Sequence, residues 1–304
     1  MINIVIINSE GKYDDNYYLL DGMTMGLQKF LSIYIVEHNE MRLMIDVGET
    51  LKIRKILKKL KEMGLYPIHK ILLTHSHWDH AQGLSKIRSS MKDLDIEILA
   101  SENAIENLKH PENMIEGFEN MGDLYPFDEE ITPLKEGDII DINGLELEVV
   151  NLFGHTMDSI GIIDKINKNI FVGDAILMRL DQNAFFVPLM PPDFHETELL
   201  KTFDKLRNMK DDFNSLSLAH FGVWKDDHFV QILEEMEDLY FKVKNSLIKW
   251  YNEDSSIEVI TNKYFKTIVP NSKVWNEKLF IFLVDMMING LKYSGLINEK
   301  IISH

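Results

Sequence analysis

Apolar residues follow two different spacings along the first 220 or so positions. Apolar residues three or four positions apart predict helices over Thr50–Met63, Gln82–Met91 and Glu196–Met209. Short runs rich in Ile, Leu and Val predict strands between them. The predicted strands are Ile2–Ile7, Ser32–Glu37, Arg42–Ile45, Ile71–Leu73, Ile96–Ala100, Ile139–Ile142, Leu145–Val150, Ile160–Ile163, Asn169–Val172 and Ser215–Ala219. This alternation predicts an α/β fold.

The pattern changes after about Gly222. Helical spacing dominates over His228–Tyr251 and Val274–Leu291. We therefore expect a first domain over residues 1–224 and a helical domain over residues 225–304. The helical part either caps the first domain or forms a dimer, or it walls a substrate pocket. Because Val274–Leu291 is apolar nearly all round, we expect a homodimer through these helices.

Composition and charge narrow the classes of function. The chain has 304 residues and no cysteine, which excludes disulfides and thiolate chemistry. Its net charge of -17 and the lack of a basic stripe argue against nucleic-acid partners. The acidic surface disfavours binding to anionic membranes. The sequence has no apolar segment long enough to predict a membrane-spanning helix. The start lacks the features of a signal peptide, so we expect a cytoplasmic location.

Candidate chemistry is concentrated directly after the predicted strand Ile71–Leu73. Four potential metal ligands lie within the next seven residues, which read Thr74-His75-Ser76-His77-Trp78-Asp79-His80. Alternation along an extended segment places His75 and His77 on one side. A turn into the next helix brings Asp79 and His80 to a neighbouring point, so the spacing predicts two adjacent metal positions. Imidazole and carboxylate ligands suit zinc, iron or manganese.

Three further candidate ligands lie where predicted strands end. They occur in Gly154-His155-Thr156, in Gly173-Asp174 and in His220-Phe221-Gly222. Ligands placed at strand ends are held by a rigid scaffold. Together with the first cluster they make seven ligands.

The order of these motifs, with Asp46-Val47-Gly48 before them, resembles the metallo-β-lactamase-fold superfamily. The resemblance covers about residues 1–224 and implies a four-layer αββα sandwich with a C-terminal helical appendage. It implies two divalent ions, with zinc preferred and iron or manganese as alternatives. It also implies that Asp46 orients the ligands, with Thr74, Thr156 and Ser159 as weaker candidates for that role. The implied ligands are His75, His77 and His155 for the first metal, Asp79, His80 and His220 for the second, and Asp174 as the bridge between them.

The same resemblance implies a hydrolase in which a metal-bridging hydroxide attacks the substrate and Asp79 orients it. The substrate we expect is a small-molecule ester, thioester or lactone, as in glyoxalase II and the lactonases. The alternatives are a mononuclear iron persulfide dioxygenase, which would need only His75, His155 and Asp174, a phosphodiesterase, and a non-catalytic binding module. The segment Phe185–Phe194 and the pair Met23 and Met25 are candidate walls for an apolar part of the substrate.

Overall fold

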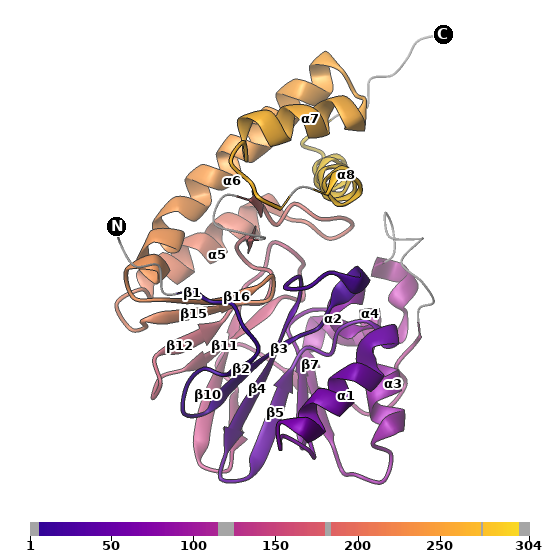
Figure 1. The fold of residues 1–304 in the computed structure, drawn as a ribbon, viewed down its shortest axis with the longest axis vertical. Coiled ribbons are helices and arrows are strands. Elements are labelled where there is room, and N and C mark those ends of the chain that lie inside the picture. Colours follow the sequence, from indigo (N-terminus) through magenta and orange to yellow (C-terminus); the bar gives the residue numbers. More distant parts are fainter. Residues whose placement is uncertain (1–5, 115–124, 180–183, 275, 298–304) are drawn as a thin grey trace.

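A computed structural model describes residues 6–114, 125–179, 184–274 and 276–297. Two seven-stranded mixed sheets form the centre of the molecule (Figure 1). The first sheet has the order β2 (Gly11–Lys12), β3 (Tyr17–Asp21), β4 (Ser32–His38), β5 (Met41–Ile45), β6 (Lys70–Leu73), β7 (Glu97–Ser101) and β8 (Thr132–Leu134). The second has the order β1 (Ile6–Ile7), β16 (Gly222–Lys225), β15 (Ser215–Leu218), β12 (Asn169–Phe171), β11 (Ile160–Asp164), β10 (Leu145–Asn151) and β9 (Ile139–Ile142).

Strand alternation explains why each sheet is covered on both faces. In β4, Ile33 and Ile35 point to the helices outside the first sheet, whereas Tyr34 and Val36 point to the second sheet. The outer helices of this side include α1 (Ile53–Glu62), α2 (Trp78–Ala81), α3 (Leu84–Ser90) and α4 (Ile105–Lys109). The predicted αββα sandwich is therefore confirmed.

The opposite side is covered by α5 (Glu196–Asn208) and by part of the long helix α6 (Asp227–Glu253). The helices α7 (Ile257–Thr267) and α8 (Glu277–Tyr293) pack against α6 beyond the end of the sheets (Figure 1). One hydrophobic core contains side chains of the second sheet, such as Leu216 and Trp224, together with side chains of these helices. The boundary expected at residue 224 falls beside Lys225, the last residue of β16. The division into two domains stays a prediction.

Several elements differ from the sequence-based expectation. Strand β3 was not predicted, because its run Tyr-Tyr-Leu-Leu-Asp shows no alternation of apolar and polar residues; four of its five residues are buried. Helix α7 was not predicted either, because its β-branched residues are not typical of a helix. Ser256 caps this helix by accepting a hydrogen bond from the Val259 amide. The helix expected from Gln82 begins at Leu84. Residues 2–5 of the first predicted strand lie outside the described residues.

A short two-stranded sheet, β13 (Met178–Arg179) with β14 (Phe185–Phe186), lies between the second sheet and the C-terminal helices. The Phe186 ring stacks on Tyr264 of α7 and meets Phe280 of α8 edge-on. Among the described residues, no helix is long and apolar enough to cross a membrane.

Candidate metal centre

The seven predicted ligands meet at one edge of the sandwich. His75, His77, Asp79 and His80 follow β6 of the first sheet. The other three follow strands of the second sheet, with His155 after β10, Asp174 after β12 and His220 after β15. Their potential ligand atoms form three overlapping groups, and within each group these atoms lie within 4.8 Å of one another. The sequence motifs, far apart in the chain, are thus brought together.

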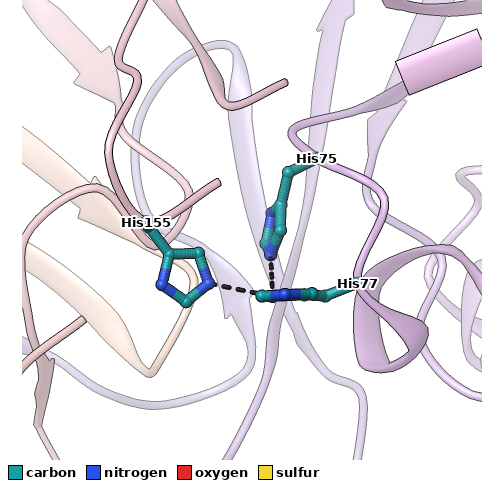
Figure 2. A group of neighbouring side chains, drawn as sticks. All are labelled: His75, His77 and His155. Atoms are coloured by element: carbon teal, nitrogen blue, oxygen red, sulfur yellow. Dashed lines mark hydrogen bonds between the residues drawn. The ribbon is translucent and has the colours of Figure 1, made fainter. Parts of the chain in front are cut away.

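Three histidines form the first group (Figure 2). The Nε2 atom of His75 lies 3.1 Å from Nδ1 of His77, and Nε2 of His155 lies 2.9 Å from the same atom. All three side chains are buried. Three ring nitrogens converging from two sheets form a ligand set for one cation.

The second group joins Asp79, His80 and His220. Oδ2 of Asp79 lies 3.7 Å from Nε2 of His80 and 3.4 Å from Nε2 of His220. Oδ2 of Asp174 lies between the groups, 3.5 Å from Nε2 of His155 and 3.2 Å from Nε2 of His220. Asp174 is therefore placed to contact a cation held by either group.

Other buried groups fix how the ligands point. Asp46 accepts hydrogen bonds from the Thr74 amide at 2.8 Å and from the Thr74 hydroxyl at 2.9 Å. Its Oδ2 also lies 2.8 Å from Nδ1 of His80. Because a carboxylate only accepts, this bond keeps the proton on Nδ1 and directs Nε2 toward the cluster. Asp46 and Thr74 therefore make the orienting contacts expected of them.

Two of the weaker candidates make other contacts. The Thr156 hydroxyl donates to Asp158 at 2.5 Å and lies 2.7 Å from the Ser159 hydroxyl. These bonds stabilise the turn after His155. We therefore assign Thr156 and Ser159 to the support of this loop.

Backbone carbonyls orient two further histidines, His155 and His220. Nδ1 of His155 lies 3.3 Å from the carbonyl oxygen of Pro188, and Nδ1 of His220 lies 2.5 Å from that of Phe30. Donation from Nδ1 to a carbonyl leaves Nε2 available as a metal ligand. Neither carbonyl could be identified from the sequence, because no side chain marks it.

The electrostatics of the two groups differ. Burial, together with the neighbouring histidines, lowers the pKa of His75 well below its usual value and that of His77 to about 3. Burial also lowers the pKa of His155. The first group therefore consists of neutral imidazoles, which is the form that binds metal.

Burial opposes charge in the second group too, but the carboxylates outweigh it. Asp174 and Asp79 raise the pKa of His220 to about 10, and with Asp46 they raise that of His80 well above its usual value. Conversely, His80 and His220 lower the pKa of Asp79 and of Asp174 in spite of burial. The two carboxylates require positive charge beside them, which a divalent cation supplies.

Unsatisfied atoms support the same assignment. Among the described side chains, Nε2 of His80 and Oδ1 of Asp174 are buried and make no hydrogen bond. Such atoms are costly unless a ligand meets them. A donor set of imidazoles and carboxylates suits zinc, iron or manganese. The residues present therefore fit a metal centre.

A pocket opens over the ligands. Its volume is about 370 Å³ including the open mouth. Besides five of the ligands, the side chains that line it are Phe30, Trp78, Met178, Met190, Phe282 and Leu283. Phe282 and Leu283 belong to α8, so the C-terminal helices do wall this pocket. Sequence reasoning missed these two residues as pocket residues, because only the packing of α8 brings them to the site.

The two segments expected to wall the site behave differently. From Phe185–Phe194, Met190 lines the pocket, whereas Phe186 packs against the C-terminal helices. Met23 and Met25 are not among the described residues that line this pocket.

The apolar residues on which the dimer expectation rested make contacts within the chain, since Phe280 is fully buried and Phe282 lines the pocket. The dimer stays a prediction.

Comparisons with known proteins agree with this architecture. A family model described as the metallo-beta-lactamase superfamily matches residues 29–220. A hydroxyacylglutathione hydrolase from Ruegeria pomeroyi is 27% identical over 112 residues, which are 37% of this chain and 35% of that protein. The chain thus aligns with only about a third of the length of this relative.

Solved structures share the fold at low sequence identity. A metallo-beta-lactamase family protein from Thermus thermophilus has a TM-score of 0.64 and 18% identity, covering 92% of this chain and 94% of its own. A beta-lactamase domain protein from Burkholderia ambifaria has a TM-score of 0.64 and 14% identity, covering 95% of this chain and 89% of its own. Coverage this high includes much of the C-terminal helical part.

Proposed function

Since the chain belongs to the metallo-beta-lactamase superfamily, we propose that it is a metal-dependent hydrolase of a small ester, thioester or lactone. The observation that carries this proposal is the position of Oδ2 of Asp174 between two groups of ligands. The thioester is included because the relative from Ruegeria pomeroyi is named a hydroxyacylglutathione hydrolase.

The ligands would hold two divalent ions. His75, His77 and His155 would hold one ion, and Asp79, His80 and His220 would hold the other. Asp174 would contact both. When bound, such ions supply Lewis acidity and lower the pKa of a bound water, so that a nucleophile exists near neutral pH. Zinc is the ion we propose, with iron or manganese as alternatives.

The chain's own side chains then position the reactants. Asp79 lines the pocket and can accept a hydrogen bond from the attacking water, which orients its oxygen toward the acyl carbon. A new bond forms between that oxygen and the acyl carbon, and the bond from this carbon to the leaving oxygen or sulfur breaks. The proton lost by the water goes to the alcohol or thiol that leaves. Phe30, Trp78 and Phe282 cover the ligands and exclude other water.

The proposal is tested by elemental analysis of the purified protein together with a substrate panel. We expect two ions per chain and hydrolysis of at least one ester, thioester or lactone, with the activity lost in Asp79→Ala. One iron per chain with oxygen consumption on a persulfide would instead establish the dioxygenase alternative. Hydrolysis of phosphodiesters alone would instead establish the phosphodiesterase alternative.

A further inference from the structure

The pocket above the metal ligands has a wall of one chemical kind. The six residues that line it besides the ligands are all apolar: Phe30, Trp78, Met178, Met190, Phe282 and Leu283. Among the described residues that line it, none is lysine or arginine. A substrate carboxylate or phosphate buried against this wall would lose water and gain no partner.

The wall is built firmly on the C-terminal helices. The Tyr264 hydroxyl of α7 donates a hydrogen bond at 2.6 Å to the carbonyl of Phe185. Gly290 of α8 packs so closely that a Cβ there would lie 2.7 Å from the carbonyl oxygen of Leu189. These contacts fix Met190 and α8 against each other, so the pocket is formed before substrate arrives.

From these observations we infer that the wall takes an uncharged, apolar acyl group of the substrate, and that Phe282 sets this specificity. The inference rests on the proposed function, because the acyl carbon must lie at the ligands while its chain extends along the wall. Two flexible methionines allow chains of different shape to fit. The net charge of -17 adds a general repulsion of anionic substrates.

Phe282 is the residue best suited to a test. It is only partly buried, so its replacement is tolerated better than that of a core residue. Ile281, the preceding residue of α8, is also partly buried but does not line the pocket. Ile281→Ala is therefore a matched control for changes in the stability of α8.

The experiment measures kcat/KM of the zinc-loaded protein for p-nitrophenyl esters from acetate to octanoate, with the hemisuccinate as the anionic partner of butyrate. We expect kcat/KM to rise about fourfold per methylene until the pocket is full. The hemisuccinate should be at least about 100-fold poorer than butyrate. Phe282→Ala should lower kcat/KM for octanoate about tenfold or more and leave acetate nearly unchanged. Ile281→Ala should keep the native profile.

Binding gives a second, independent measurement. Calorimetric titration with methyl ketones of increasing chain length should show the same dependence on length in the wild type and a weaker one in Phe282→Ala. A flat profile in both experiments, or a preference for the hemisuccinate, overturns the inference. If no ester, thioester or lactone is hydrolysed but the ketones bind with the expected dependence, the pocket inference stands and the proposed reaction is wrong.

Discussion

Replacing Asp46 by Asn gives a sharp test of how the metal centre is oriented. Asp46 does not reach the pocket, yet its two oxygens accept from the Thr74 amide, from the Thr74 hydroxyl and from Nδ1 of His80. Asparagine has the same shape but carries an NH2 group in place of one oxygen. Only one of the two positions that held a carboxylate oxygen can therefore still accept a hydrogen bond.

Either orientation of the new amide is unfavourable. If its NH2 faces His80, Nδ1 must become the acceptor and the proton moves to Nε2, which removes the ligand atom. If its NH2 faces Thr74, two donors meet where a bond of 2.8 Å existed. A buried donor left without an acceptor costs about 1–3 kcal/mol. That cost corresponds to a loss of metal affinity of about 5- to 150-fold, in line with about 10- to 100-fold for such orienting residues.

The assay is a zinc titration in competition with a chromogenic chelator, which resolves the two proposed ions by affinity. We expect Asp46→Asn to lower strongly the affinity for the ion at Asp79, His80 and His220, because only His80 is affected directly. The affinity for the ion at His75, His77 and His155 should fall much less. Asp164→Asn, a change at a fully buried carboxylate bonded to Tyr17 and Asn167, controls for general damage to the fold. Native affinity for both ions in Asp46→Asn would refute the orienting role.

Three further outcomes are expected. Asp174→Ala should remove hydrolysis and lower the metal content, because its Oδ2 faces both ligand groups; native turnover with both ions present would contradict the proposed reaction. Tyr17→Phe should lower the free energy of unfolding by about 1–3 kcal/mol in urea, because Asp164 loses a buried donor, while activity per folded molecule is unchanged. Gly290→Ala should displace α8 from Leu189, which is measured as a lower Tm together with a loss of kcat/KM on long acyl esters and little loss on acetate.

The convergence of the seven candidate ligands could be predicted because most of them follow shortly after a predicted strand. His75, His77 and His80 follow a strand that reads clearly as apolar, and the single residues at 155, 174 and 220 also follow predicted strands. Each strand fixes the position of its last residue, so candidate ligands within a few residues of a strand end are held close to that position. The alternating elements by themselves predicted an α/β fold, and the four-layer sandwich followed from the resemblance carried by the ligand motifs.

The substrate wall could not be predicted in this way. Phe282 lies on a helix that is apolar on nearly every side, so nothing in its pattern distinguishes a pocket residue from a core residue. Its place over the ligands depends on the contact between Gly290 and Leu189, which are about a hundred positions apart in the chain. The orienting carbonyls of Phe30 and Pro188 could not be predicted either, because every residue type has a backbone carbonyl oxygen.

The distribution of the ligands over the two sheets has a consequence for how the chain matures as it leaves the ribosome. The cluster from His75 to His80 is synthesised early and offers only part of a binding site. His155, Asp174 and His220 follow later, and each belongs to the other sheet. In the proposed metal centre, an ion gains its full affinity only when all of its ligands are in place, so complete uptake waits until the two sheets have docked. In the proposed two-ion centre, the position of His220 in the sequence sets the earliest moment at which the second ion can be held, whereas the group of His75, His77 and His155 is complete earlier in the chain.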